Sequence, residues 1–151
     1  MEIPSGVVAS GKEESMKKIQ WKYVSPLREK SAVDVLEIKY HYLLPGDLKS
    51  CILENNAGVP SPCLFDFGEN KGKVFGGLLS YNPDDLDNIY EFIGLFWDES
   101  NSNLSMFPFG IDPAGNFLCV KDKKVVFFDH ETGNAIPICD TFMQLLEMLH
   151  D

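Results

Sequence analysis

The spacing of apolar side chains changes along the chain between a pattern typical of helices and one typical of strands. The clearest helical pattern lies near the C-terminal end, where apolar residues recur at positions i, i+3, i+4 and i+7. These residues are Phe142, Leu145, Leu146 and Leu149. Thr141 and Gln144 match a capping box, in which each side chain bonds the backbone N–H of the other residue. The sequence therefore predicts a helix over 142–149.

The segment 31–42 fits two interpretations, because one set of its apolar residues has helical spacing and another alternates as in a strand. The helical set is Val33, Leu36 and Tyr40, and the alternating set is Ile38, Tyr40 and Tyr42. We favour a helix that ends near Tyr40, because good helix formers occupy 36–39 and a Pro follows.

Two stretches combine Pro with acidic residues in the way that helix starts do. The first, 44–47, precedes an apolar face, and Gly58 is predicted to end this helix in a left-handed conformation. The second, 82–85, offers Asn82 as a cap for a longer helix. The apolar residues of that longer helix are Leu86, Ile89, Tyr90, Ile93, Phe96 and Trp97.

Short apolar runs separated by turn residues predict strands in the remainder of the chain. An extended segment or short strand is expected over 19–27, followed later by strands at 63–67 and 74–80 around a turn at 69–72. Gly76 and Gly77 inside the second of these strands indicate a bulge or a close approach by another segment. Further strands are expected at 105–111, 116–120, 125–129 and 136–139.

The short connections between the later strands require antiparallel pairing. Helices and strands in this order predict an α+β fold, in which helices pack against a largely antiparallel sheet. We expect a loose N-terminal arm at 1–18, which has few apolar groups, and a single domain at 19–151.

The net charge of the chain bears on which classes of macromolecule it can bind. It has 13 Lys and Arg against 23 Asp and Glu, a formal net charge of -10. Nucleic acids and anionic membranes are bound by cationic side chains, so neither is an expected partner. A basic protein would instead be attracted at low salt. Solubility alone is an equally good explanation of the charge.

The cysteine spacing and the N-terminal segment predict a cytoplasmic protein whose cysteines are reduced. Cys51, Cys63, Cys119 and Cys139 form no CxxC pair, and the first 18 residues contain no long apolar run that would act as a secretory signal. We therefore expect four free thiols and no disulfides. Neither a metal nor a cofactor is expected, because metal-ligand spacings and glycine-rich phosphate loops are missing from the sequence.

The triplet Asp129-His130-Glu131 is the strongest candidate for chemistry, because it offers an imidazole between two carboxylates. Neighbouring residues of a strand point to opposite faces, so these side chains cannot converge without a bend. A solvated strand end is the better interpretation. A hydrolase using Asp129, His130 or Asp112 stays open as a hypothesis and requires these groups to meet in a pocket.

An acidic group in the second half of the chain is the candidate partner-binding site. Its members are Asp84, Asp85, Asp87 and Glu91, extended by Trp97, Asp98 and Glu99. Acidic residues early in a helix stabilise the helix dipole, which is the structural explanation. Docking of a basic partner is the functional one, in which Trp97 would contribute strongly if it is exposed.

Several motifs in order resemble the SUKH superfamily, the Smi/Knr-type domain, over about 31–149. They are the segments 36–40, 44–48, 55–60, 107–120 and 125–131, followed by the helix that begins after Thr141. The motif positions expected to be structural are Leu44, Pro45, Asn56, Gly58, Pro60, Asp112 and Gly115. One departure is Ala57, where the family more often has Gly.

This resemblance implies an α+β domain that binds another protein and carries no catalytic set. Bacterial relatives are commonly immunity proteins that neutralise toxins, many of them nucleases or deaminases, and a fungal relative regulates cell-wall synthesis. The first hypothesis is therefore an inhibitor that binds a basic toxin domain. The alternative is a regulatory or scaffold module of the same family without a toxin partner.

Overall fold

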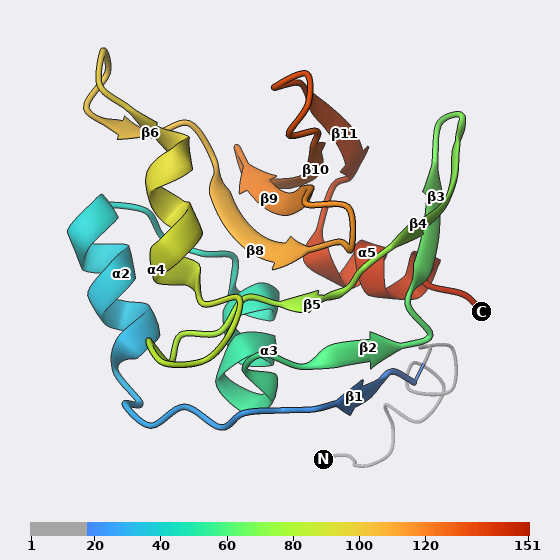
Figure 1. The fold of residues 1–151 in the computed structure, drawn as a ribbon, viewed down its shortest axis with the longest axis horizontal. Coiled ribbons are helices and arrows are strands. Elements are labelled where there is room, and N and C mark those ends of the chain that lie inside the picture. The colour runs from blue at the N-terminus through green and yellow to red at the C-terminus, as the bar shows by residue number, and fades with distance from the viewer. Residues whose placement is uncertain (1–17) are drawn as a thin grey trace, which may run out of the picture.

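A computed structural model describes residues 18–151 (Figure 1), so the predicted arm at 1–18 lies outside the described residues except for Lys18. The helices are α2 (Ala32–Tyr40), α3 (Gly46–Asn55), α4 (Ile89–Phe92), the 3-10 helix η1 (Ile93–Phe96) and α5 (Phe142–Met148). The first strands are β1 (Gln20–Lys22), β2 (Val59–Ser61), β3 (Leu64–Phe67), β4 (Asn70–Val74) and β5 (Gly77–Leu78). The later strands are β6 (Trp97–Asp98), β7 (Asn103–Leu104), β8 (Phe107–Ile111), β9 (Phe117–Lys121), β10 (Lys124–Phe128) and β11 (Ala135–Cys139).

The main sheet has five strands in the order β11-β10-β9-β8-β5, and every pairing is antiparallel. The predicted meander and the predicted α+β class are both confirmed. Asp122 and Lys123 connect β9 to β10 with φ values of 51° and 69°. Two consecutive residues with positive φ are typical of the tight turn whose twist matches a hairpin.

Three smaller strand pairs, β1–β2, β3–β4 and β6–β7, lie outside the main sheet. The strand predicted at 74–80 is divided between β4 and β5, and β4 already begins at Asn70, within the predicted turn. The two glycines explain the break. A Cβ added to Gly76 would lie 3.0 Å from the carbonyl oxygen of Ile111, and Gly77 has a φ of 145°. The predicted close approach by another segment is therefore present.

Aromatic rings fill much of the core between the sheet and the C-terminal helix. Phe109 of β8 meets Phe142 of α5 edge to face, with ring centroids 5.5 Å apart, and it contacts Phe75 in the same way at 6.0 Å. The predicted capping box at the start of α5 is present, since Thr141 accepts the Gln144 N–H and the Gln144 side chain accepts the Thr141 N–H. This cap fixes the direction from which α5 packs on the sheet.

The helix predicted from Asn82 is wrong over its first part. Helix α4 begins only at Ile89, where the Asn88 side chain accepts the N–H of Glu91 as a cap. Residues 82–88 form a loop, and Asn82 is buried with 1% of its surface exposed. Trp97 leaves the helix and begins β6. Contacts with distant segments decide the conformation of this loop, as the next subsection describes.

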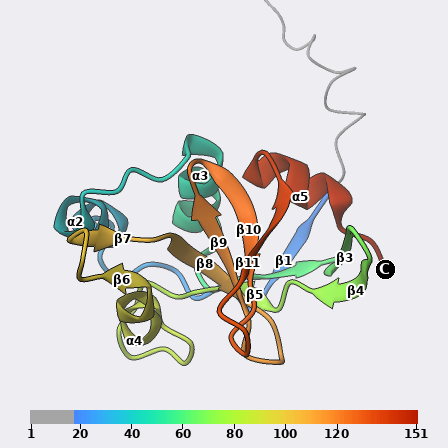
Figure 2. The same ribbon diagram turned by 90° about the horizontal axis from the view of Figure 1, so that it is seen from above.

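The predicted helix over 31–40 is confirmed as α2, but the predicted role of Gly58 at the end of α3 is wrong. Ala57 takes the left-handed conformation instead, with a φ of 66°. Gly58 is required for space, because an added Cβ would lie 2.8 Å from the Asn55 carbonyl oxygen and 3.1 Å from the Trp21 ring. In Figure 2, α2, α4 and β6 lie at one end of the molecule, and β3 and β4 lie at the opposite end.

Candidate functional site

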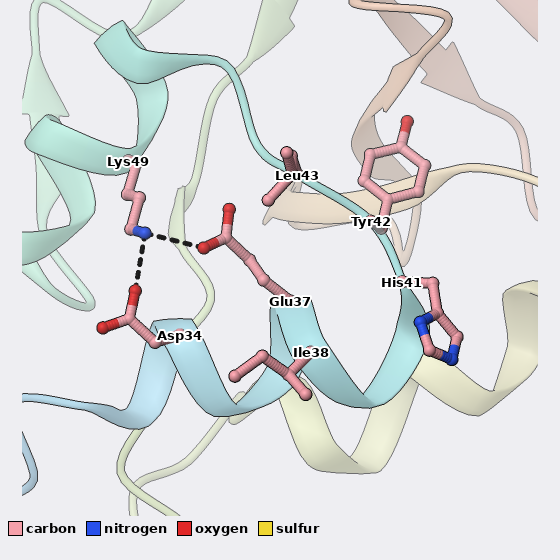
Figure 3. Close-up of a pocket in the computed structure, with 7 residues that line it drawn as sticks. All are labelled: Asp34, Glu37, Ile38, His41, Tyr42, Leu43 and Lys49. Carbon is pink, nitrogen blue, oxygen red and sulfur yellow. Dashed lines mark hydrogen bonds and ion pairs between the residues drawn. The ribbon is translucent and has the colours of Figure 1, made fainter.

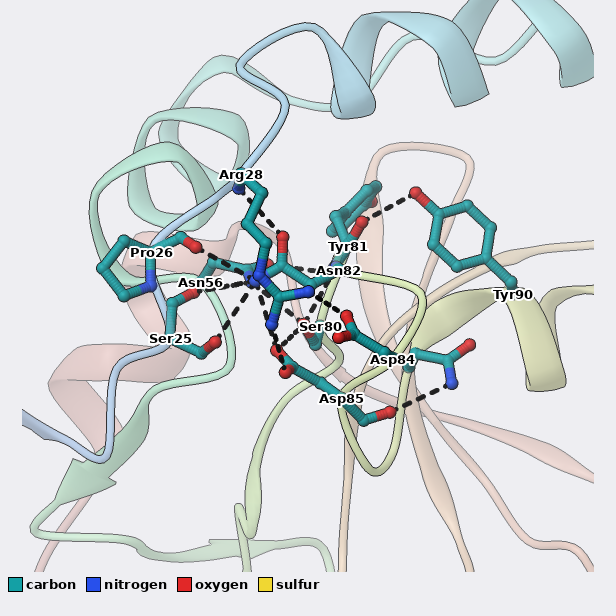
Figure 4. Close-up of polar contacts among 11 residues, drawn as sticks. Ser25, Pro26, Arg28, Asn56, Ser80, Tyr81, Asn82, Asp84, Asp85 and Tyr90 are labelled. Atoms are coloured by element: carbon teal, nitrogen blue, oxygen red, sulfur yellow. Dashed lines mark hydrogen bonds and ion pairs between the residues drawn. The ribbon is translucent and has the colours of Figure 1, made fainter.

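The loop at 82–88 is held by a buried polar network (Figure 4) that uses part of the predicted acidic group. Asp85 accepts hydrogen bonds from the Ser80 hydroxyl at 2.7 Å and from the Asn82 side chain at 3.2 Å. The Ser80 bond is the main reason why the pKa of Asp85 is lowered. Arg28 forms ion pairs with both Asp84 and Asp85. The Asp85 carboxylate is therefore a structural part of the loop.

The other members of the acidic loop keep their carboxylates near solvent. Asp87 is exposed, and it holds the loop through its backbone, whose carbonyl accepts the Ser80 N–H at 3.1 Å. Glu91 is exposed and accepts a bond from the Asn88 side chain at 2.9 Å. Between the aspartates, Leu86 has 91% of its surface exposed. A fixed loop thus presents an apolar side chain among carboxylates.

The remaining predicted site residues lie at the far end of α4 and η1. Trp97 is 37% exposed, and its ring centroid lies 6.0 Å from that of Tyr40 on α2. Asp98 accepts bonds from the Ser100 N–H at 3.0 Å and from the Asn101 side chain at 2.8 Å, so it holds the β6–β7 turn. Glu99 is exposed. The seven predicted residues therefore flank one short helical segment, although they do not share one helix.

Figure 1 shows α2 beside α4, and two hollows are lined by residues from both sides of this seam. One, of about 230 Å³, has Val35 of α2 and Tyr90 of α4 among its lining residues. The other, of about 430 Å³, is lined by Lys39, Tyr40, Gly94 and Trp97. Both hollows combine aromatic rings with apolar surface, which is the composition of the centres of protein interfaces.

A larger hollow, of about 750 Å³, lies on another side of α2 (Figure 3). Within it Glu37 is only 5% exposed, and its carboxylate accepts the Leu44 N–H at 2.8 Å. Lys49 of α3 lies 2.6 Å from both Glu37 and Asp34, and its bond to Asp34, followed by that to Glu37, raises the pKa of the ammonium group. This cluster leaves no signal in the sequence, because Lys49 of α3 and the two carboxylates of α2 come from separate helices.

The motif residues of the resemblance occupy buried connections and turns. Leu44 is 7% exposed, Pro45 precedes the first turn of α3, and Pro60 of β2 faces Trp21 of β1. Asn56 is 1% exposed, and its side chain bonds to the Ser25 carbonyl, the Ser80 hydroxyl and the Tyr81 N–H. These contacts join α3, the segment before α2 and the acidic loop.

Asp112 and His130 are linked only through a third residue. The Asp112 carboxylate accepts the N–H groups of Ala114 and Asn116 and the side-chain amide of Asn116. The Asn116 oxygen lies 2.7 Å from Nδ1 of His130. Gly115, with a φ of 89°, completes this turn. The Asp129 carboxylate accepts the Glu131 N–H. This arrangement braces two turns and does not unite the three groups that the hydrolase hypothesis requires.

The described part of the chain contains neither a metal-binding cluster nor a membrane-spanning helix. Among residues 18–151, no group of three or more His, Cys, Asp and Glu side chains has the geometry to hold a metal ion. None of the described helices has the length and apolar character needed to cross a membrane.

Comparison with known proteins places most of the chain in one family. The model of the SMI1 / KNR4 family (SUKH-1) matches residues 29–148, a range that includes each described helix and the five strands of the main sheet. A search of curated proteins gives no match to the chain.

Proposed function

We propose, from the premise that the chain belongs to the SMI1/KNR4 family (SUKH-1), that it is a non-enzymatic protein-binding domain. Its role in this proposal is that of an immunity protein, which binds a cognate toxin such as a nuclease and neutralises it. Domains of this family are commonly immunity proteins, and residues 19–151 would form the binding domain. The protein would bind the toxin in the cytoplasm of its own cell, before the toxin acts there.

The uneven distribution of charge is the observation that carries this proposal. The chain has a net charge of -10, and the stretch 74–120 contains no Lys or Arg at all. A domain that acts on nucleic acid is basic, because it neutralises phosphates. Opposite fields speed the encounter of two proteins and favour the correct partner. An acidic inhibitor therefore suits a basic toxin domain.

The contact residues predicted from the sequence are also the ones that we propose for binding, but they contribute in different ways. Asp84, Asp87 and Glu91 supply exposed charge at one end of α4, and Glu99 supplies it beyond η1. Asp85 and Asp98 hold the loops on which these charges stand. Trp97 adds an aromatic side chain, a type that often contributes strongly to binding.

Co-expression with the protein encoded by the neighbouring gene tests the proposal. We expect the two proteins to co-purify and the toxicity of the neighbour to disappear. An inactive neighbour with its catalytic residue replaced should still co-purify, which separates binding from survival. Neither binding nor rescue would contradict the immunity role and favour a regulatory or scaffold module of the same family.

A further inference from the structure

Exposed apolar side chains gather at one end of the described molecule. Ten large hydrophobic residues are exposed in residues 18–151, and seven of them lie on α2, in the loop after it or between 86 and 97. The seven are Val35, Ile38, Leu43, Leu86, Tyr90, Leu95 and Trp97, of which Ile38 and Leu43 line the hollow of Figure 3. Single exposed hydrophobics are normal on protein surfaces, but a concentration of this kind marks a site of interaction.

The aromatic members of this group are held in place before any partner arrives. The Tyr90 hydroxyl donates a hydrogen bond to the Tyr81 carbonyl at 2.8 Å. The Trp97 ring lies against Tyr40, so both ends of the α4–η1 segment are tied to their surroundings. Fixed aromatic side chains lose little conformational entropy on binding, which is why they serve as anchors.

Carboxylates surround these anchors without matching cations in the same stretch. Residues 74–120 contain seven Asp and Glu and no Lys or Arg. Six of the seven lie between 84 and 99, and they are Asp84, Asp85, Asp87, Glu91, Asp98 and Glu99. Arg28 compensates part of the charge of Asp84 and Asp85, and Lys39 of α2 adds one cation to the lining of the second hollow, so the carboxylates still outnumber the cations. The remaining negative field selects a partner surface that carries Lys and Arg.

We propose that the seam between α2 and the α4–η1 segment is the docking surface for a basic protein surface with protruding apolar side chains. The surface, called here the α2/α4 seam, is centred on Val35, Tyr40, Tyr90 and Trp97, which line the two hollows, and it includes the exposed Leu95 next to Gly94. Apolar side chains of the partner enter the two hollows beside α2, and its basic residues meet the carboxylates around them. This inference rests on the proposed function and names the face that it uses.

The hollow in Figure 3 is the competing surface, because it is larger and has Leu43 on its lining. Its carboxylates already share the ammonium group of Lys49, so they offer less unmatched charge to a basic partner. Leu43 is 83% exposed and Leu95 is 68% exposed, so both can be replaced by Arg without disturbing the core. This pair of variants separates the two surfaces.

The first experiment measures binding of the neighbouring gene product to full-length variants. Leu95→Arg and Trp97→Ala should weaken the complex by about 30-fold or more, as changes at central anchors do. Leu43→Arg and Met143→Arg should change affinity by less than about threefold. Met143 is a matched control, because it is 38% exposed and lies on α5. Loss of binding in Leu43→Arg with full binding by Leu95→Arg would overturn the α2/α4 seam.

If the neighbouring gene product does not bind, that result contradicts the proposed function but does not test the docking surface. A second experiment tests the surface by itself. The probe is a synthetic peptide in which Leu and Trp alternate with Arg, and its control has Glu in place of Arg. Amide NMR shifts should move first around Val35 and Leu95, and only with the basic peptide. Shifts centred on Lys49 or on α5, or no saturable shift up to about 1 mM, would overturn the proposed surface.

Discussion

The side-chain oxygen of Asn56 accepts the backbone N–H of Tyr81 at 2.9 Å, across 25 positions in the sequence. The amide nitrogen of the same side chain donates to the Ser25 carbonyl and the Ser80 hydroxyl. One buried amide thus satisfies three groups from two separate segments. Because the acidic loop begins directly after Tyr81, Asn56 also fixes the place from which that loop leaves the core.

Replacing Asn56 by Ala should reduce the free energy of unfolding by about 2–4 kcal/mol, because the buried Tyr81 N–H would lose its partner and Ser25 and Ser80 would each lose one hydrogen bond. Urea denaturation followed by circular dichroism measures this change. Asn134→Ala is the control, since Asn134 is exposed, and it should stay within about 0.5 kcal/mol of the unchanged protein. Equal stability of the two variants would show that the network does not hold the fold.

Gly58→Ala should destabilise the protein by about 1–3 kcal/mol, because the new methyl group would lie 2.8 Å from the Asn55 carbonyl oxygen. Gly46→Ala provides the comparison. No atom lies within 4 Å of a Cβ at Gly46, where Ala should be neutral or stabilise by about 0.4–1 kcal/mol. Thermal unfolding of both variants measures the contrast. A stable Gly58→Ala protein would mean that the segment before α2 can move aside.

Lys49→Met should cost about 2–3 kcal/mol of stability, because it leaves the buried Glu37 carboxylate without its cation. The Leu44 N–H still bonds to Glu37, and Lys49 is partly exposed. For both reasons the loss of unfolding free energy should be smaller than for a fully buried ion pair. Adding Glu37→Gln to Lys49→Met removes the uncompensated charge and should restore part of the stability. Chemical denaturation of the single and double variants gives this coupling, and a purely additive result would argue against it.

The loop that carries the acidic group should become less stable in acid. Bonds to the Asp85 carboxylate, the Ser80 bond first, lower its pKa in the folded state. The stability that this group contributes is therefore complete above the ordinary Asp pKa of about 4 and is lost as the pH falls through the lower folded-state pKa. The difference in unfolding free energy between the unchanged protein and Asp85→Asn should shrink below about pH 4. A difference that stays constant down to about pH 2 would contradict this assignment.

Elements that depend on local sequence were predictable, and those that depend on distant partners were not. The capping residues of α5 lie within that helix start, and the meander is connected by short turns, so both could be predicted. The start at Asn82 has the same local signals, but its side chain bonds to Ser25 and Pro26, more than 50 residues earlier. Those bonds hold residues 82–88 as a loop, and tertiary contacts of this kind override helix propensity.

The candidate site also has features that the sequence shows and features that depend on the tertiary structure. The charge of the segment 84–99 and the presence of Trp97 within it are visible in the sequence. The exposure of Val35 and Leu95 is not visible there, because it depends on how α2 and η1 are placed against the sheet. Neither the pairing of Arg28 with Asp84 nor that of Lys49 with Glu37 leaves a signal in one sequence, since the partners lie on separate elements.

Binding of a basic partner to the α2/α4 seam should depend on salt mainly through the association rate. Charges at the rim act over a distance of about 10 Å at 0.1 M salt, and higher ionic strength screens them. Raising the salt from about 50 to 500 mM should slow association by about tenfold and change dissociation little. Glu99→Lys, at an exposed position, should slow association at low salt and flatten this dependence. Stopped-flow tryptophan fluorescence, with Trp97 at the proposed surface, measures both rates on mixing with the neighbouring gene product. If dissociation alone responds to salt, the carboxylates are buried contacts and not a rim that attracts the partner.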